Sequence, residues 1–258
     1  MIDSVCVREL SASRARLRLV GRDAKRFLHG MVTNDITGLG PGGGCHAAML
    51  TVKGKLLSDL CVYDLGAEGL LLELPAATAE TIRTALDRYL ITDDATLSDA
   101  SAELGELGVY GAGAAAAVQA LGADREVASL PPYHFAAAGS LHLAASPELG
   151  VPGFHLIGPP EAVAAARAQL VGQGARELSE SEASVLRVEA GVPQYGSDLD
   201  EERMPSEGRL DDVFSATKGC YLGQEVVVLL RAPGQQNHQL VRLRLLAAEA
   251  PPAPGTRL

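Results

Sequence analysis

The segment from Lys218 to Glu225 gathers more reactive side chains than any other part of the sequence. It reads K-G-C-Y-L-G-Q-E, so a thiol and a phenol lie between two glycines, and an amide and a carboxylate open an apolar run typical of a helix. Gly219 and Gly223 permit positive φ angles or a close approach of the backbone to a ligand. Lys218 and a nearby helix N-terminus are surroundings that favour a nucleophilic thiolate at Cys220.

The same segment also fits a strand-to-helix turn that contains a half-buried, inert cysteine. A thiol without an assigned base is usually unreactive. A cysteine hydrolase needs a histidine partner, and the sequence singles out none of His134, His155 and His238. Both interpretations of the segment stay open at the level of residue chemistry.

Other polar groups have equally ordinary explanations. The segments R-D-A-K-R-F-L-H-G-M-V-T-N-D-I and H-A-A-M-L-T-V-K-G-K-L-L-S-D-L match no nucleotide loop or metal motif and fit an amphipathic helix and a hairpin. Glu189, in R-V-E-A-G, lies late in a predicted helix, where the helix dipole disfavours an anion. It therefore needs a compensating partner, which could be the donor edge of a ligand, Arg187 or water.

The elements that must position these residues follow a pattern of two strands and a helix that occurs twice. In the first expected strand, Leu17 and Leu19 share one face while Arg16 and Arg18 share the other. The other expected strands cover residues 45–51, 56–65, 69–74, 140–146 and 154–158. The expected helices cover residues 24–31 (capped by Asp23), 78–90 and 160–171. This pattern predicts an α+β fold with a loose duplication.

Two regions interrupt this pattern. The irregular stretch at 122–139 is the predicted boundary between two lobes of a body that covers residues 1–235. Ser179 and Glu182 have the spacing of a capping box and predict a helix that ends at Gly191. The long polar loop after it suggests a functional or clamping role. Residues 236–258 contain a strand-like stretch and then Pro-Gly, as if a further β element began there.

Composition narrows the class of protein. The chain has 258 residues, of which 47% are hydrophobic and 21% charged, as in a soluble globular protein. A net charge of -10 argues against direct, sequence-independent nucleic-acid binding. We expect no membrane span and no secretory signal, and therefore a cytoplasmic location. The four cysteines form no C-x-x-C pair, so neither a disulfide framework nor a metal site is expected.

Four segments, taken in order, resemble the folate-binding YgfZ family. They are F-L-H-G-M-V-T-N-D-I, K-G-K-L-L-S-D-L, L-R-V-E-A-G-V-P-Q-Y-G and K-G-C-Y-L-G-Q-E-V-V. The resemblance runs from about Leu17 to Arg242 and extends to the related T-protein of the glycine cleavage system, an aminomethyltransferase. It implies a folate-binding α+β body of two intertwined lobes around a central hole. It also implies a small C-terminal β-barrel, which would be truncated here because only 236–258 remain for it.

The resemblance further implies tetrahydrofolate, or a derivative of it, as the ligand. Glu189 would accept hydrogen bonds from the pterin, because R-V-E-A-G is similar to the corresponding T-protein segment. Chemistry alone suggests an apolar wall for the aminobenzoyl ring from Tyr221, Phe214 and Met49. It also suggests Arg231 as the cation for the glutamate tail.

One departure from the aminomethyltransferases decides between two related functions. Ser58 and Asp59 stand where those enzymes have two adjacent aspartates, so only Asp59 could act as the catalytic carboxylate. The resemblance to YgfZ therefore implies an accessory protein that supports the assembly or repair of iron–sulfur clusters, including those of tRNA-modifying enzymes. Its partners would be iron–sulfur enzymes or cluster-assembly proteins.

In that function Cys220 would be the working thiol, tuned by Lys218, while Gln224 and Glu225 fix the loop or face the ligand. A single thiol cannot hold a cluster alone, since clusters need about four ligands. The alternative function is a tetrahydrofolate-dependent aminomethyltransferase of the glycine cleavage type, and a third is a folate-binding module that makes no use of the thiol. Whether the chain is an enzyme stays open at this point.

Overall fold

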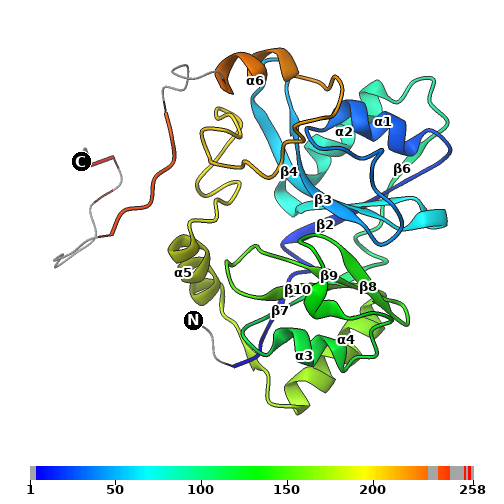
Figure 1. Cartoon of the computed structure of the whole chain (residues 1–258), viewed down its shortest axis with the longest axis vertical. Coiled ribbons are helices and arrows are strands. Elements are labelled where there is room, and N and C mark those ends of the chain that lie inside the picture. Colours follow the sequence, from blue (N-terminus) through cyan, green and yellow to red (C-terminus); the bar gives the residue numbers. More distant parts are fainter. Residues whose placement is uncertain (1–3, 232–237, 245–252, 254, 257–258) are drawn as a thin grey trace.

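Two β-sheets, each with helices on one face, form the two lobes of the protein (Figure 1). The computed structural model describes residues 4–231, 238–244, 253 and 255–256, without the side chains of residues 230 and 231. The architecture is α+β, as the sequence predicts.

The first lobe holds a five-stranded antiparallel sheet in the order β3-β4-β5-β2-β6. Its strands are β2 (Arg14–Val20), β3 (Gly44–Leu50), β4 (Leu56–Asp64), β5 (Leu70–Pro75) and β6 (Thr96–Asp99). Its helices are α1 (Ala24–Met31) and α2 (Ala79–Tyr89), with short 3₁₀ turns at Gly66–Glu68 and Ala76–Thr78. Asp23 precedes α1 but makes no side-chain cap; its carboxylate accepts a hydrogen bond from the backbone of Asp94 instead.

The second lobe holds a six-stranded sheet in the order β11-β1-β7-β10-β9-β8. Its strands are β1 (Cys6–Glu9), β7 (Gly105–Tyr110), β8 (Phe135–Ala138), β9 (Leu141–Ala145), β10 (Gly153–Gly158) and β11 (Arg176–Glu177). Its helices are α3 (Ala114–Gln119) and α4 (Pro160–Gly172), with a 3₁₀ turn at Val127–Ser129. The order β8-β9-β10-β7 repeats the order β3-β4-β5-β2, so the two lobes have a duplicated core.

The lobes are intertwined because β1, at the start of the chain, joins the second sheet. The chain passes from the first sheet to the second between Asp99 and Gly105. This crossing lies before the predicted boundary at 122–139, a stretch that falls between α3 and β9 of the second lobe. The stretch lies within the second lobe and holds its 3₁₀ turn and strand β8.

Each sheet has one face toward its helices and one toward the other lobe. Leu17 and Leu19 pack beneath α1 and α2, as the alternation of β2 predicts. The opposite face of β2 is not solvent, however: Arg16 is only 1% exposed, because that face packs against the second lobe. A small apolar cluster that includes Leu71 and Ile157 joins the two lobes there.

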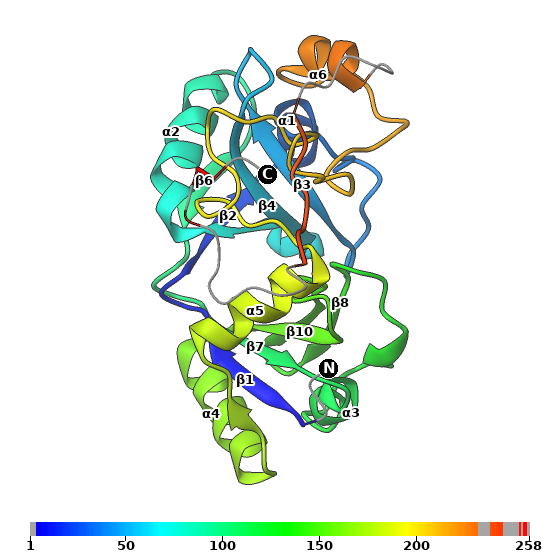
Figure 2. The same cartoon turned by 90° about the vertical axis from the view of Figure 1, so that its left-hand side faces the viewer.

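A third layer crosses between the lobes (Figure 2). Helix α5 (Glu180–Ala190) begins at the predicted capping box of Ser179 and Glu182 and ends at Gly191, which has a left-handed φ of 75°. The segment 192–223 then returns to the first lobe and leads into α6 (Gln224–Arg231). Among the described residues of the predicted barrel, 238–244 form neither helix nor strand, so the barrel stays a prediction.

Candidate functional site

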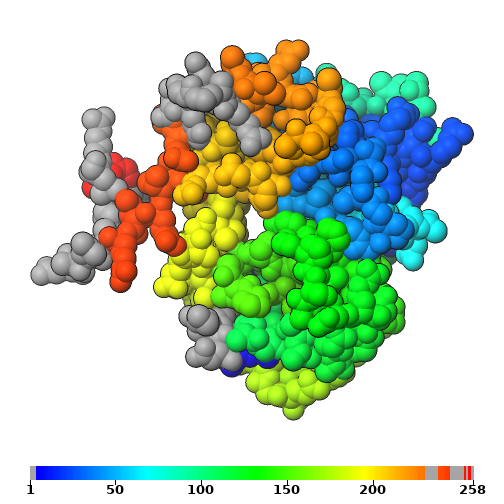
Figure 3. Space-filling model, in the orientation of Figure 1, coloured from blue at the N-terminus to red at the C-terminus, as the bar shows by residue number. Residues whose placement is uncertain are grey.

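A cavity of about 400 Å³ lies between the two lobes and beneath the segment that follows α5. In the space-filling view the surface is hollowed beside this segment (Figure 3). Both sheets, α5 and the loop 191–212 contribute to its lining. The polar lining residues that matter below are His46, Asp59, Tyr133, Glu148, His155, Arg187, Arg209 and Asp212.

The alternation of β4 decides which of its two polar residues reaches this cavity. Ser58 is fully buried on the helix side of the sheet, where its hydroxyl pairs with Thr78 at 2.7 Å. Asp59 has the opposite orientation and lines the cavity. A carboxylate at position 58 would lie beneath α2 and not in the cavity. The serine therefore does not deprive the cavity of its acid.

Asp59 is held by a histidine that bridges two carboxylates. His46 Nε2 lies 3.1 Å from Asp59 Oδ2, and His46 Nδ1 lies 2.9 Å from Asp212 Oδ2. Burial disfavours the charged imidazole, but its hydrogen bonds to Asp212 and Asp59 outweigh this and raise the pKa of His46 to about 9. The imidazolium in turn lowers the pKa of Asp59 despite the burial of that carboxyl. All three groups are charged near neutral pH, with one negative charge in excess.

Asp212 joins both lobes to the loop that closes the cavity. Its carboxylate accepts a hydrogen bond from the Tyr133 hydroxyl at 2.7 Å, and its backbone carbonyl accepts one from Asn34 Nδ2 at 3.0 Å. The ring of Tyr133 stacks on His46 with centroids 5.4 Å apart. This cluster fixes the wall of the cavity at a point where β3, the second lobe and the loop meet.

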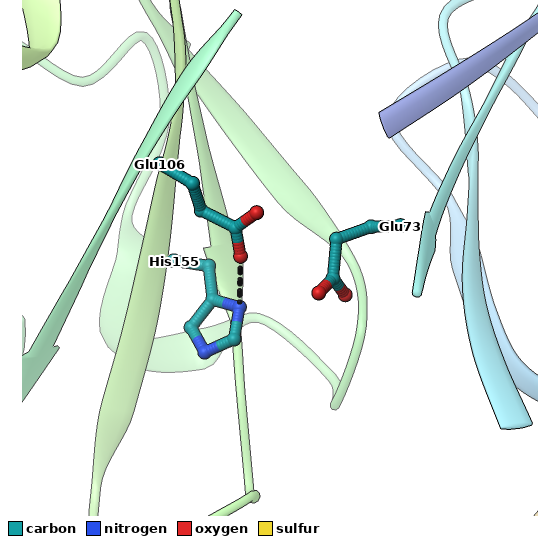
Figure 4. Close-up of side chains that lie close together, drawn as sticks. All are labelled: Glu73, Glu106 and His155. Carbon is teal, nitrogen blue, oxygen red and sulfur yellow. Dashed lines mark ion pairs between the residues drawn. The ribbon is translucent and has the colours of Figure 1, made fainter. Parts of the chain in front are cut away.

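Six charged groups form a network between the lobes that extends from the wall of the cavity inward; Arg16, Glu73, Glu106 and His155 are buried. Glu73 of β5 pairs with Arg14, and Glu106 of β7 pairs with Arg16 at 3.3 Å. His155 of β10 lies 2.9 Å from Glu106 (Figure 4). It also lies 3.1 Å from Glu148. Burial opposes a charge on His155, but Glu148 and Glu106 raise the pKa of this histidine to about 10.

Among the described residues, this network also contains a group of side chains whose spacing would allow them to hold a metal ion. One ligand atom each of Glu73, Glu106 and His155 lies within 4.8 Å of the others. With a proton on His155, however, the three carboxylates Glu73, Glu106 and Glu148 are matched by Arg14, Arg16 and His155. A metal ion would have to displace that proton. The charges therefore support an ion-pair network as the explanation of this cluster.

The segment Lys218–Glu225 lies outside the lining of the cavity. The ammonium of Lys218 donates to the carbonyls of His29 and Val32 at 2.5 Å and of Asn34 at 3.0 Å, at the C-terminal end of α1. Burial lowers the pKa of Lys218 to about 8. Its three N–H groups are used, so none is left for the thiol of Cys220. No direct contact between Lys218 and Cys220 supports the predicted effect of the lysine on the reactivity of this thiol.

Some of the other residues of the segment are needed for its backbone conformation, and others are exposed on the surface. Cys220 is exposed, whereas Cys6 is buried and Cys45 and Cys61 are partly buried. Gly223 has a φ of 83°, and a Cβ there would lie 2.5 Å from a backbone oxygen, so glycine is required. Gly219 faces open space. Gln224 begins α6 and is half-buried, and Glu225 is exposed.

The predicted folate-binding residues are not brought together. Met49 lies in the core beneath α1 and α2, while Phe214 and Tyr221 pack on an apolar cluster around Leu50 and Leu56. Glu189 is exposed on a face of α5 that does not line the cavity, and the side chain of Arg231 is outside the described part of the structure. Of the predicted site residues whose side chains the structure describes, Asp59 alone is in the cavity lining.

Several lining residues were not expected from the sequence. Tyr133, Arg209 and Asp212 are far apart along the chain and belong to no recognisable spacing. His46 begins the quoted hairpin segment that also holds Asp59, but nothing in that segment assigns it a role. Tyr195 had a usable signal, since it lies in the V-P-Q-Y-G stretch that carries part of the family resemblance. Tyr133, Arg209 and Asp212 could be found only from the topology that joins the lobes.

Two helix-covered sheets with a repeated strand order and a polar cavity between them define a two-lobed α+β protein with a candidate ligand site. Residues 3–218 match the family described as the GCVT N-terminal domain. The chain belongs to this family, which confirms the T-protein-like part of the resemblance seen in the sequence. The comparisons do not distinguish YgfZ within it.

The relatives are aminomethyltransferases. The chain is 32% identical to the aminomethyltransferase of Prochlorococcus marinus (strain MIT 9303), with 75% of this chain and 56% of the relative covered. It is 31% identical to that of Nitrosomonas eutropha, with 88% and 63% covered. It thus spans little more than half the length of the curated relatives it matches.

A solved structure confirms the fold. The glycine cleavage system aminomethyltransferase T from Bartonella henselae superposes with a TM-score of 0.75 at 18% identity, covering 89% of this chain and 64% of that one. Among the described residues, none of the helices combines the length and the apolar character needed to cross a membrane.

Proposed function

We propose that this chain binds a reduced folate, tetrahydrofolate or a derivative of it, in the central cavity. A volume of about 400 Å³ falls within the range of small-molecule sites. The cavity lies between the lobes of a GCVT-family fold and has both aromatic walls, from Tyr133 and Tyr195, and convergent charged groups. These features suit a ligand with a flat ring system and a charged end.

We further propose that the chemistry is one-carbon transfer of the aminomethyltransferase type. The observation that carries this proposal is the ionised carboxylate of Asp59 in the cavity wall. The departure at Ser58 argued against a transferase in the sequence, but Ser58 is directed away from the cavity. The names of the relatives support the same reaction.

The residues of the cavity have separable roles in this proposal. Asp59 accepts a hydrogen bond from a ligand nitrogen and can take its proton, which makes the nitrogen more nucleophilic. His46 and Asp212 hold that carboxylate in place. Because the three groups together carry excess negative charge, they also stabilise positive charge that develops in the cavity during transfer.

The isosteric variant Asp59→Asn tests the proposal. We expect the rate of methylene-tetrahydrofolate formation from an aminomethylated lipoyl protein to fall by about a hundredfold or more, the range for loss of an acid–base group. Asp211→Asn, an exposed neighbour of the cavity loop, is the matched control and should retain the wild-type rate. No turnover by the wild-type chain, or equal rates in both variants, would count against the transferase.

The predicted role of Glu189 requires the ligand to extend past the cavity lining to the outer face of α5. Calorimetric titration of tetrahydrofolate with Glu189→Ala tests this. A loss of about thirtyfold in affinity, equivalent to about 2 kcal/mol, would support the contact. An unchanged dissociation constant, which the exposed position of Glu189 favours, would remove this residue from the site.

A second candidate function is favoured by the exposure of Cys220. It is the accessory role in iron–sulfur cluster assembly or repair that the resemblance to YgfZ implies, with cluster enzymes, including tRNA-modifying ones, as partners in the cytoplasm. Cys220 is the one exposed thiol among the four cysteines and stands in the K-G-C-Y-x-G-Q-E segment. An exposed thiol is available to a partner protein in a way that the other three are not.

The two functions differ in which residue matters. Cys220→Ala should leave transferase turnover unchanged, and in cells it should lower the activity of cluster-dependent enzymes only if the accessory role is correct. Asp59→Asn should have the opposite profile if the transferase is correct. Full retention of cluster-enzyme activity in cells that carry Cys220→Ala would leave the thiol without a function.

A further inference from the structure

The first lobe has a second cavity, of about 560 Å³, on the helix side of its sheet. It lies between α2 and the turn that joins β3 to β4, and it shares no lining residue with the central cavity. Its floor is apolar and contains Met49 and Leu50, which are fully buried, and the half-buried Leu222. Its volume is in the range of small-molecule sites, and the proposed function makes no use of it.

A β-bulge adds a side chain to this floor. The register of β3 and β4 skips Leu57, between Leu56 and Ser58. Simple alternation would direct Leu57 to the same face of the sheet as Asp59, toward the central cavity. The bulge turns it instead to the helix side, where it packs on the core beneath α1 and α2 and lines the second cavity. The irregularity of β4 therefore extends the apolar floor.

The wall on α2 is a helix face of small side chains that ends at a cation. Thr81, Thr84, Ala85 and Arg88 have the spacing of one face, and all four line the cavity. The first three are small, so they leave open space between the helix and the turn. Across that space, Val52 of the turn also lines the cavity and is 65% exposed.

The charged groups at the two ends of this wall differ in whether they are paired. At the N-terminal end, Glu80 accepts hydrogen bonds from Arg83 on both carboxylate oxygens, at 2.8 and 2.9 Å. At the C-terminal end, Arg88 and Tyr89 have neither an ion-pair nor a hydrogen-bond partner for their side chains within the described part of the chain. Arg88 complements the dipole of α2, but this interaction occupies none of its N–H groups. A guanidinium and a phenol are therefore available to an anion at that end.

We propose that this second cavity binds an aliphatic carboxylate of medium chain length, such as octanoate. The hydrocarbon chain lies on the apolar floor and covers Val52, and the carboxylate accepts hydrogen bonds from Arg88 and Tyr89. The helix rises about 10 Å from Thr81 to Arg88, which limits the length of chain that the wall can cover. The site is independent of the folate site and of the function proposed for it.

The test is calorimetric titration of the whole chain with three probes, octanoate, hexanoate and octanamide. Each buried methylene should raise the affinity about fourfold, so octanoate should bind about tenfold or more tightly than hexanoate. Thr84→Phe places a ring in the cavity from an exposed position of α2, so it should weaken all three probes about tenfold or more and leave the melting temperature unchanged. Arg88→Gln should lower the affinity for octanoate about two- to fivefold, the range of an exposed ion pair, and leave that for octanamide unchanged.

Arg83→Gln, on the same helix but outside the lining, is the matched control and should bind octanoate like the wild type. No binding by the wild type, an affinity that does not depend on chain length, or binding that survives Thr84→Phe would overturn the proposal. Equal effects of Arg88→Gln on octanoate and octanamide would overturn the selection for an anion. Saturating octanoate should leave the dissociation constant of tetrahydrofolate unchanged, and a competitive shift would place octanoate in the central cavity instead.

Discussion

The central cavity and the Lys218–Glu225 segment are two candidate sites of opposite character. The cavity is assembled from residues distant in sequence, such as His46, Asp59 and Asp212, whose charges are paired; His46 and Asp59 are largely buried there, whereas Asp212 is half exposed. The segment is contiguous in sequence, and its cysteine is exposed. Its lysine stabilises the end of α1 and makes no contact that would activate the thiol. A dense motif is thus not by itself a catalytic centre.

The two regions are nevertheless connected through one side chain. The carbonyl of Asn34 accepts a hydrogen bond from Lys218, and its amide donates to the carbonyls of His46 and Asp212. Part of the segment therefore supports the wall of the cavity from behind. The comparison predicts that substitutions in the charged network between the lobes change the free energy of unfolding most. Substitution of Lys218 should have a moderate effect on it, and substitution of Cys220 a small one.

The largest effect is expected from the network between the lobes. Glu106→Gln leaves the buried guanidinium of Arg16 without its counter-charge, which typically costs about 3–5 kcal/mol of unfolding free energy. The measurement is equilibrium unfolding in urea.

Glu103→Gln is the matched control. Glu103 pairs with Arg18, which lies on β2 like Arg16, but Glu103 is 66% exposed. It should change stability little, since exposed pairs contribute little. Equal stabilities of the two variants would show that the buried network does not hold the lobes together.

The next effect concerns pH. The pKa of His46 is raised from its ordinary value of 6.5 to about 9 by its two carboxylate partners. The protonated histidine therefore stabilises the folded state fully below about pH 6.5, and this contribution disappears as the pH rises through about 9. At 1.36 kcal/mol for each pKa unit, it amounts to about 3 kcal/mol at most.

His155, whose pKa is raised to about 10, acts in the same direction, so the wild type should lose stability from neutral pH to pH 10. Unfolding measured at pH 6, 8 and 10 should show a shallower decline for His46→Gln than for the wild type. Parallel profiles for the two proteins would contradict the bridging role of His46 between Asp59 and Asp212.

Regular structure was more predictable than the site. The alternation in β2 and β4 and the capping box of α5 are local signals, so these elements were recovered from the sequence. The burial of Arg16 was not, because alternation shows that two faces differ but not what covers the second one. The same limit applies to Asp59: its residue type was noticed, but its partners His46 and Asp212 come from another strand and from a loop 153 positions away in sequence.

The folate-binding residues show the other limit of the sequence. Met49, Phe214 and Tyr221 are candidates for the apolar wall that a ring needs, but the same apolar character places such side chains in a hydrophobic core. The residue type alone cannot tell a side chain in the wall of a ligand site from one in the hydrophobic core. Tyr133 and Tyr195 line the cavity instead, because the strands and the loop that carry them face the other lobe.

A moderate effect is expected for Lys218→Met. The ammonium satisfies three carbonyls at the C-terminal end of α1, where a cation also interacts favourably with the helix dipole. Its loss should cost about 1–2 kcal/mol of unfolding free energy. Lys53→Met, at an exposed turn, serves as the control and should leave stability unchanged.

The same variant sharpens the comparison of the two sites. If Lys218 activates the thiol, as the sequence suggested, the rate at which Cys220 reacts with a disulfide reagent should fall about tenfold or more in Lys218→Met. The hydrogen bonds of the lysine lead us to expect a change of less than about twofold. A large fall in a variant that remains folded would restore the activating role.

The smallest effect on stability is expected at Cys220 itself. In the native protein at pH 8, one thiol per chain should react rapidly with the reagent, and Cys220→Ala should abolish this phase. Burial raises the pKa of Cys45 to about 12 and that of Cys61 well above its usual range, while Cys6 is inaccessible. These three thiols should react only after unfolding. Two rapid thiols in the native state would mean that the wall formed by β3 and β4 opens in solution, and the contrast between a closed cavity and an exposed segment would then fail.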